Sequence, residues 1–155
     1  MTKVLYGERI GKRAQLRVGC SAAIFDRHRD KLLLIRRADN GQWCLPGGGM
    51  DAGESIVEAC AREVHEETGL VVEVGRLIGA YTSPDVLLAY PDGNEVQVVG
   101  LLFEATVVGG ELQVSDEATA FGYFSHAEIE DMDLLPLHYD RIRDAFIGQE
   151  AAFVR

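Results

Sequence analysis

A glycine-rich loop that leads directly into a glutamate-rich segment constrains this chain more than any other stretch. Residues 47–70 read GGGMDAGESIVEACAREVHEETGL. Ser55 lies three residues before Glu58, which is the spacing of a capping box, where each side chain bonds a free amide of the first helical turn. Gly69 is well placed to end the helix, because glycine adopts the left-handed conformation at little cost. The sequence therefore predicts a helix over residues 55–68.

One face of this helix is expected to be buried. Val57, Cys60, Ala61 and Val64 recur at helical spacing and form an apolar stripe. His65 falls away from the acidic residues and is interpreted as structural.

Three glutamates crowd one turn on another face. Glu63, Glu66 and Glu67 stand at i, i+3 and i+4, which places their carboxylates on neighbouring ridges. These like charges repel, and a hard divalent cation such as Mg²⁺ or Mn²⁺, which prefers oxygen ligands, would relieve the repulsion. Arg62 is four residues from both Glu58 and Glu66 and can orient a carboxylate. The alternative is a solvated acidic face with an ordinary Glu58–Arg62 ion pair.

The loop before the helix favours a functional site. Its glycines at 47, 48, 49 and 53 let the backbone approach phosphates or turn a carbonyl toward a cation, and the loop ends at a helix N-terminus. A glycine loop alone would more often be a simple turn, so the inference depends on the glutamates that follow.

The residue order across this segment resembles the signature of the Nudix hydrolases at every defined position. The match runs Gly48, five residues, Glu54, seven residues, Arg62-Glu63-Val64, one residue, Glu66-Glu67, one residue, Gly69-Leu70. The order of predicted strands and helices from about residue 16 to 147 is also similar to that of the family. Both the resemblance and the alternation of elements imply an α/β fold, an α/β/α sandwich with a mixed β-sheet between helices.

The resemblance implies roles for residues of this segment. Glu63, Glu66 and Glu67 would be metal ligands, joined by the backbone carbonyl of Gly47 or Gly48. Arg62 would orient the catalytic carboxylates. Glu54 would be an additional ligand or would lie close enough to contact the substrate.

A glutamate in a loop before an aromatic-ended strand commonly serves this family as a further metal ligand or general base. Glu117 precedes the predicted strand 120–124 and is assigned that role, with Asp116 as the alternative. A solvated loop carboxylate is the competing interpretation. Either Glu66 or Glu117 would accept the proton of the attacking water.

Arginines and aromatic side chains supply candidate substrate contacts. Arg36 and Arg37 end the predicted strand 31–37 and would either bind a substrate phosphate or keep a sheet edge soluble. Tyr81, Tyr90 and Phe103 would either stack on a base or pack in the core, and packing is the favoured role for Trp43.

The activity implied by the resemblance is Mg²⁺-dependent hydrolysis of the diphosphate linkage in a nucleoside diphosphate linked to another group X, such as ADP-ribose or another sugar nucleotide. A (d)NTP pyrophosphatase that sanitises nucleotides is an alternative. A non-catalytic, nucleotide-sensing Nudix domain is another, but it would be expected to lose a carboxylate of the signature, and none is lost.

The whole chain narrows the context. With 155 residues it is expected to be one domain, 1–155, with residues 1–15 as an extended or irregular arm. Its net charge of −10 argues against nucleic acid or an anionic membrane as partner. No signal-like or membrane-spanning segment is recognised, so a cytoplasmic protein with three reduced cysteines is expected. The resemblance also allows a homodimer.

The remaining elements are predicted from periodicity and turn residues. Residues 17–26 are expected to form a strand buried on both faces, paired in a hairpin with 31–37. The other predicted elements are strands 71–80, 86–90, 95–108 and 120–124, a short helix capped by Ser125 and Glu128, and a last helix over 137–147. His126 and His138 are expected at the surface or at helix caps.

Overall fold

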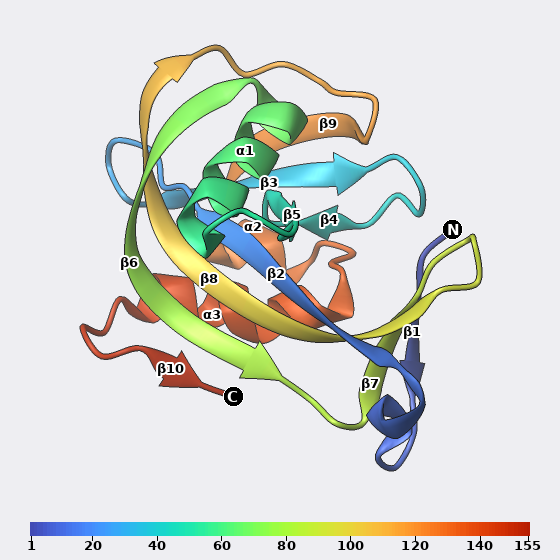
Figure 1. The fold of residues 1–155 in the computed structure, drawn as a ribbon. Helices are drawn as coiled ribbons and strands as arrows, with labels where there is room; N and C mark the ends of the chain where they lie inside the picture. Colours follow the sequence, from blue (N-terminus) through green and yellow to red (C-terminus); the bar gives the residue numbers. More distant parts are fainter.

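Two β-sheets lie between helix α1 on one side and helices α2 and α3 on the other, as Figure 1 shows. The structure is a computed structural model that describes all 155 residues. The elements are β1 (Lys3–Tyr6), η1 (Ile10–Arg13, a 3-10 helix), β2 (Gln15–Ala23), β3 (Lys31–Arg37), β4 (Trp43–Cys44), β5 (Gly47–Gly49), α1 (Ile56–Thr68), β6 (Leu70–Thr82), β7 (Val86–Ala89), β8 (Glu95–Gly110), β9 (Ala118–Ser125), α2 (His126–Glu130), η2 (Pro136–His138, a 3-10 helix), α3 (Tyr139–Ile147) and β10 (Phe153–Val154). The predicted α/β/α architecture is confirmed.

The larger sheet has seven strands and is mixed. Strand β8 lies at its centre, where it pairs in parallel with β2 and antiparallel with β6 and β7. The smaller sheet has the order β4-β3-β9. The predicted hairpin of the 86–90 and 95–108 strands and the central position of the latter are both confirmed. None of the helices has the length and hydropathy needed to cross a bilayer.

Alternation along the strands divides the core between the two helical layers. In β2, Cys20 and Ala22 pack toward α1, whereas Ala23, the next residue, packs toward α3. In β8, Phe103 belongs to the α1 side and Leu102 to the α3 side. This division follows from the period-two geometry of a strand, which sends successive side chains to opposite faces.

Helix α1 begins and ends where the sequence predicts. Ser55 and Glu58 form the capping box, and Gly69 ends the helix in the left-handed conformation with φ of 73°. Such a cap stabilises a helix by about 1 kcal/mol. The predicted buried stripe was wrong at one end, because Val57 is 45% exposed whereas Ala59, Cys60 and Val64 are buried.

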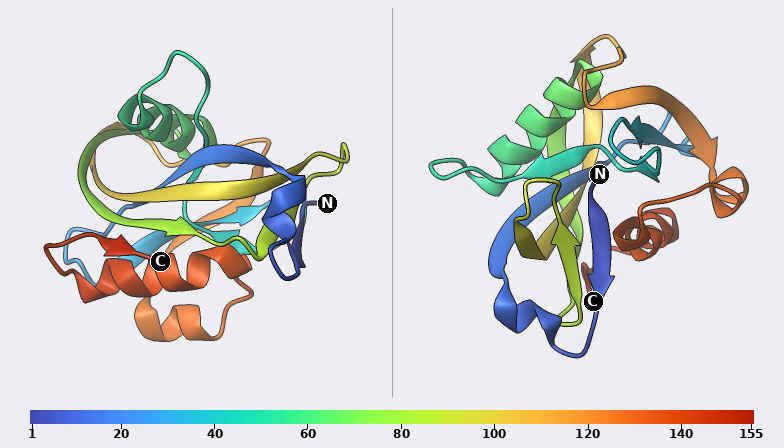
Figure 2. Two further views of the ribbon diagram at one scale, coloured as in Figure 1. Left: turned by 60° about the horizontal axis from the view of Figure 1, so that its bottom comes forward. Right: turned by 90° about the vertical axis from the view of Figure 1, so that its right-hand side faces the viewer.

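The start of the chain is more regular than expected. Residues 1–15 are not an irregular arm, because β1 pairs antiparallel with β7 and is followed by η1. The arm thereby adds an edge strand to the larger sheet, and Figure 2 shows it beside β7.

The first two long strands also differ from expectation. In β2 only the second half is buried, and residues 15–18 are exposed. Strands β2 and β3 share a short turn, marked by the Phe25–Leu32 bridge, and then separate into different sheets instead of forming a full hairpin. The last helix begins as the 3-10 turn η2 and continues as α3.

Candidate active site on the first helix

Strand β5 lies directly against the acidic face of α1. The Gly47 amide donates a 2.8 Å hydrogen bond to Oε2 of Glu67, and the carbonyl of Gly49 accepts one of 3.0 Å from Arg62. A Cβ on Gly48 would lie 2.4 Å from the carboxylate of Glu63, which is closer than van der Waals contact allows. Gly48 is therefore required for the close approach of β5 to the helix, and the predicted approach of the glycines to phosphate or a cation stays a prediction.

Two of the glutamates are shielded from solvent. Glu67 is only 8% exposed, and burial raises its pKa to about 8, with repulsion from Glu63 and Glu117 adding to the rise and the Gly47 amide opposing it. Burial also raises the pKa of Glu63, although its ion pair with Arg62 opposes this shift. Without a cation, the surroundings of Glu63 and Glu67 therefore disfavour their charged forms, and the protein's own donors offset this only in part.

Arg62 connects the loop to the helix. It contacts Glu54 at 2.5 and 2.9 Å, Glu63 at 2.9 Å and Glu66 at 3.3 Å. The hydrogen bonds from Arg62 lower the pKa of Glu54 to about 2. The alternative Glu58–Arg62 ion pair is wrong, because Glu58 bonds back to the Ser55 amide at 2.7 Å. Arg62 is therefore positioned to orient carboxylates.

The chemistry of these side chains fits a hard divalent cation. Glu63, Glu66 and Glu67 offer only oxygen donors, and their mutual repulsion is what a bound cation would relieve. No group of three or more Asp, Glu, His or Cys side chains is gathered closely enough to hold a metal ion. Glu63 and Glu66 instead contact Arg62, and Glu67 contacts the Gly47 amide. The ligand roles of these residues, and of the Gly47 and Gly48 carbonyls, stay predictions.

Glu117 lies near the same face although it comes from the loop before β9. Its charge contributes to the raised pKa of both Glu63 and Glu67. Its backbone is held by two hydrogen bonds, from the Ala38 amide at 2.9 Å and to the Ser115 hydroxyl at 3.3 Å. The side chain is exposed, as a general base that must reach water would be.

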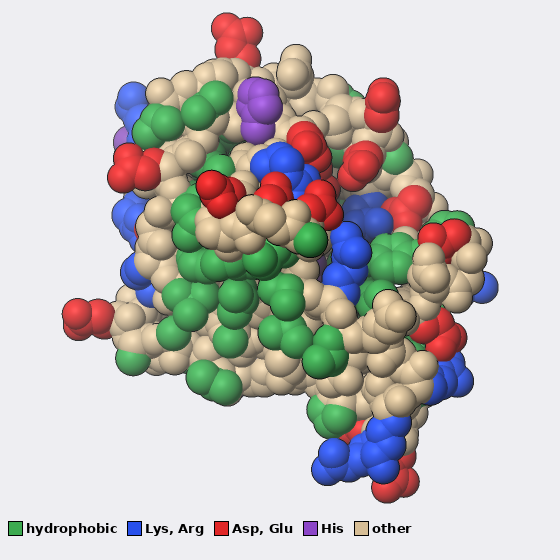
Figure 3. All heavy atoms as spheres, viewed as in Figure 1, with side chains coloured by type: hydrophobic (Ala, Val, Ile, Leu, Met, Phe, Trp, Pro, Cys, Tyr) green, Lys and Arg blue, Asp and Glu red, His purple; other side chains and the backbone are tan.

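A cavity free of carboxylates opens beside β5, which we call the glycine strand (Gly47–Gly49). We call this cavity the loop cavity, and its lining includes Gly47–Gly49 and three arginines, Arg17, Arg37 and Arg141, with no Asp or Glu. Arg37 lines this cavity and is held by Asp39 at 2.9 and 3.2 Å, and its predicted contact with a substrate phosphate stays a prediction. Arg36 is not part of the lining, because its guanidinium donates to the Gly41 carbonyl at 2.9 Å. Figure 3 shows acidic side chains over α1 with arginine and lysine side chains beside them.

Arg17 and Arg141 were not identified as candidate site residues from the sequence. Arg17 was available as a signal, since it is the charged residue at the start of an otherwise apolar strand. Arg141 gave none, because it lies on α3, far in sequence from the glycine loop, and only the folded chain brings it to the cavity.

The aromatic candidates divide between packing and the cavity. Tyr90 lines the loop cavity, whereas Phe103 is in the core and the hydroxyl of Tyr81 donates to Asp144 at 3.0 Å. Trp43 packs edge-on against Phe124 with ring centroids 5.0 Å apart, which confirms its predicted packing role.

His138 occupies the N-cap of α3, one of the two places expected for it, although its side chain does not cap the helix. The side chain is buried at 6% exposure, and its Nδ1 accepts a 3.0 Å hydrogen bond from the Leu45 amide. Burial, together with the charge of Arg141, lowers the pKa of His138 well below 6.5. The neutral ring therefore anchors the segment that leads into β5.

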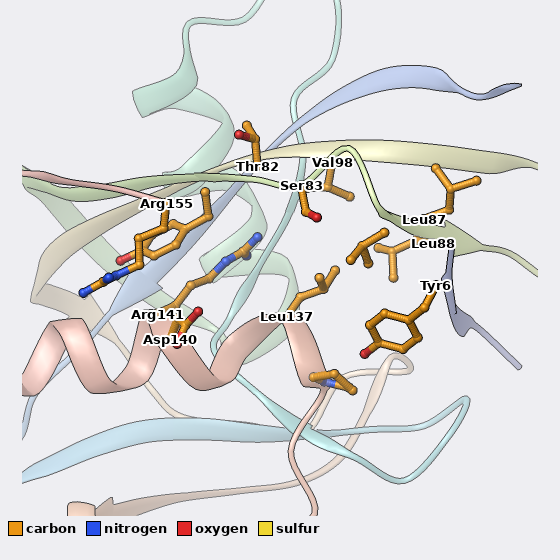
Figure 4. Close-up of a pocket in the computed structure, with 13 residues that line it drawn as sticks. Tyr6, Thr82, Ser83, Leu87, Leu88, Val98, Leu137, Asp140, Arg141 and Arg155 are labelled. Atoms are coloured by element: carbon orange, nitrogen blue, oxygen red, sulfur yellow. The ribbon is translucent and has the colours of Figure 1, made fainter. Parts of the chain in front are cut away.

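A second cavity adjoins the first. We call it the helix cavity, and Figure 4 shows it between α3, the end of β6 and the strands β7 and β8. Its volume is about 220 Å³, and Leu88, Val98, Leu137 and Arg141 line both cavities.

Comparison with known proteins agrees with this arrangement. A family model described as NUDIX domain matches residues 15–145. An ADP-ribose pyrophosphatase of Methanocaldococcus jannaschii is 41% identical over 110 residues, which is 69% of this chain and 58% of that protein. The nucleoside triphosphatase NudI of Escherichia fergusonii is 31% identical over 110 residues, covering 66% of this chain and 78% of that protein. The crystal structure of an ADP-ribose pyrophosphatase from Streptococcus suis has a TM-score of 0.67 at 28% identity and covers 90% of this chain and 97% of that one.

Proposed function

Because this chain belongs to the Nudix family, we propose that it hydrolyses the diphosphate linkage of a nucleoside diphosphate linked to another group X. The observation that carries the proposal is the contact between the glycine strand and the carboxylates of α1, joined by the Gly47–Glu67 hydrogen bond. This contact places backbone groups suited to phosphate beside side chains suited to a cation.

The catalytic groups follow from this geometry. Glu63, Glu66 and Glu67 would hold Mg²⁺, with Mn²⁺ as a substitute, and members of the family generally use divalent metal ions. The metal would supply charge neutralisation of the diphosphate and a bound water of lowered pKa. Arg62 orients the carboxylates of Glu63 and Glu66, and its hydrogen bonds to Glu54 connect it to the loop before the helix.

Residues around α1 are assigned to proton transfer and to substrate positioning. Glu117 or Glu66 would accept the proton of the attacking water, since both side chains are exposed on this side of the molecule. Arg37, whose guanidinium borders the loop cavity, is the better placed of the two predicted phosphate contacts, because Arg36 is held by Gly41.

The chemical identity of the X group is proposed from the activities of similar proteins. ADP-ribose as substrate is supported by the similar proteins from M. jannaschii and S. suis, both of which are ADP-ribose pyrophosphatases, and other sugar nucleotides are related candidates. A nucleoside triphosphate, in which X is phosphate, is supported by the NudI relative. A non-catalytic sensing domain is the third candidate, and it is opposed by the complete set of signature carboxylates.

The surrounding context stays proposed as well. The substrate is a small nucleotide, not a nucleic acid, and we expect the protein in the cytoplasm. A homodimer also stays a prediction, and light scattering on the purified chain at several concentrations would test it.

A hydrolysis screen tests the main proposal. The protein would be incubated with Mg²⁺ and ADP-ribose, other sugar nucleotides, (d)NTPs or dinucleoside polyphosphates, and the products identified by mass spectrometry. We expect release of a nucleoside monophosphate that disappears when the metal is chelated. Tight nucleotide binding without any product would instead favour the sensing domain.

A further inference from the structure

Arg141 is a buried arginine whose charge has no acidic partner. It projects from α3 into the wall that separates the loop cavity from the helix cavity, and it is only 6% exposed. Figure 4 shows its side chain reaching from the helix toward the sheet. Its guanidinium makes one hydrogen bond, from Nη1 to the hydroxyl of Ser21 at 3.1 Å, and its Nε is buried with no acceptor.

The carboxylates nearest in sequence are engaged elsewhere. Asp144, wholly buried on the same helix, accepts from Tyr81 at 3.0 Å and from Arg155 at 2.8 Å. Asp140 pairs with Arg143 at 2.9 Å. The guanidinium of Arg141 lies 5.5 Å from the centre of the Tyr81 ring, and Asp140 and Arg155, which line the helix cavity with it, are both paired with other residues. An arginine buried without an anion is costly, because its charge has lost water and gained no opposite charge.

The sheet is shaped to admit this side chain. A Cβ on Gly100 would lie 2.2 Å from Nη2 of Arg141, so any larger residue there would displace the guanidinium. Gly100 lies in the middle of β8, where glycine weakens a strand, and the close approach accounts for it.

A second free arginine faces the same space. Arg17 borders the loop cavity with its guanidinium against Gly49, and it forms no ion pair. Arg37 is already neutralised by Asp39. The cavity therefore holds two uncompensated positive charges and no carboxylate, in a protein whose net charge is −10. Arginine pairs with phosphate through two parallel hydrogen bonds, so phosphate is the ligand that this environment suits best.

We propose that Arg141 is a substrate-binding, specificity-determining residue that binds a phosphate of the X group, beyond the scissile diphosphate. This inference rests on the proposed function and narrows it. Substrates whose X group is a phosphate or carries one are then preferred to ADP-ribose, whose terminal ribose is uncharged. The phosphate of X could belong to a triphosphate, a dinucleoside polyphosphate or a phosphorylated sugar, and all three offer the same oxygens to Arg141.

The first test compares substrates in the parent protein and in Arg141→Gln. We expect the parent to hydrolyse ATP, diadenosine tetraphosphate or ADP-ribose 1″-phosphate with kcat/KM about tenfold or more above that for ADP-ribose. Whichever of the three is preferred identifies the source of the phosphate. Arg141→Gln should lower kcat/KM for the preferred substrate by about 10- to 100-fold, mainly through KM, and leave ADP-ribose within a few-fold. Equal losses on both kinds of substrate, or a parent that prefers ADP-ribose, would overturn the inference.

Matched variants separate binding from folding. Arg143→Gln removes an exposed arginine of the same helix and should change neither substrate. Arg141→Lys keeps the charge and should restore part of the preference, and Gly100→Ala should weaken it by crowding the guanidinium. If Arg141→Gln unfolds, Arg141→Lys and Gly100→Ala provide the test. An unchanged ratio of kcat/KM between the preferred substrate and ADP-ribose in both variants would then contradict the proposal.

A binding measurement keeps this inference distinct from the proposed function. Isothermal titration of inorganic phosphate into the metal-free protein should show one site, which Arg141→Gln weakens and Arg143→Gln leaves intact. A protein that binds phosphate through Arg141 but hydrolyses nothing would refute the proposed function alone. Phosphate affinity that is the same in the parent and in Arg141→Gln would refute the inference alone.

Discussion

The Gly47 amide and the Glu67 carboxylate, twenty positions apart in the chain, are joined by a hydrogen bond of 2.8 Å. This bond fixes the glycine strand on the first helix and gives the buried carboxylate its only hydrogen bond from the protein. The amide also stabilises the charged form of Glu67 and so opposes the rise in pKa that burial causes. The position of the glycine strand and the charge of the Glu67 carboxylate therefore depend on each other.

Gly47→Ala is expected to destabilise the protein strongly. Gly47 has φ of 151°, and a Cβ there would lie 2.1 Å from the carbonyl of Cys20. We expect the free energy of unfolding to fall by more than about 2 kcal/mol in urea titrations, because backbone strain and a clash combine.

Gly53→Ala is the matched control for that change. Gly53 also has a positive φ, of 96°, but nothing lies within 4 Å of its Cβ position. Its loss should be about 1 kcal/mol, from backbone strain alone. Equal losses at the two positions would show that the contact with β2 does not matter.

Glu66→Gln is expected to remove most turnover while the fold stays intact. Glu66 is exposed and contributes one ion pair to Arg62, at 3.3 Å, so little stability depends on it. Because Glu66 is a predicted metal ligand and candidate base, its replacement should lower kcat by about a hundredfold or more. Glu58→Gln, on the same helix but occupied in the capping box, is the control. Turnover of Glu66→Gln within a few-fold of the parent would refute the role.

Mg²⁺ is expected to stabilise the folded protein. A ligand that binds only the folded state at about 100 times its Kd adds about 2.7 kcal/mol to the free energy of unfolding. Thermal unfolding with and without Mg²⁺ should show this increase in the parent and a much smaller one in Glu67→Gln, which keeps an acceptor for the Gly47 amide. An identical shift with Glu67→Gln would mean that the metal binds elsewhere.

His138 is expected to lower the stability of the fold as the pH drops below about 6.5, the pKa of an unfolded histidine, whereas the raised pKa of Glu67 acts in the opposite direction over the same range. Folded His138 has a pKa well below that value because it is buried beside Arg141, so below pH 6.5 the unfolded chain binds a proton that the folded one does not. The slope contributed by this residue is at most about 1.4 kcal/mol per pH unit. Urea titrations from pH 7 to 5 should therefore show that the free energy of unfolding of the parent, minus that of His138→Gln, falls with decreasing pH, because the contribution of Glu67 is common to both proteins.

His126→Gln provides the comparison for that experiment. His126 is exposed, so its removal should leave the pH dependence of unfolding unchanged. If both histidine variants have the same pH dependence of unfolding as the parent, the pKa of His138 is not lowered by folding.

Local sequence determined the first helix and much of its chemistry. The Ser55–Glu58 capping box, the stop at Gly69 and the spacing of Glu63, Glu66 and Glu67 depend only on residues within one or two turns, so their geometry follows from helical periodicity. Turn residues at 91–94 were likewise sufficient for the β7–β8 hairpin. The role of Trp43 as packing also followed from its type and place.

Tertiary structure decided everything that depends on distant parts of the chain. The exposed half of β2, the pairing of β1 with β7, the burial of His138 and the separation of Arg36 from Arg37 at the cavity are set by which surfaces meet. Arg141 is the clearest case, because its environment comes from β2, β6 and β8 as well as from its own helix. Periodicity tells which side chains share a face of one element, but only the packing of several elements determines which charges are left without a partner.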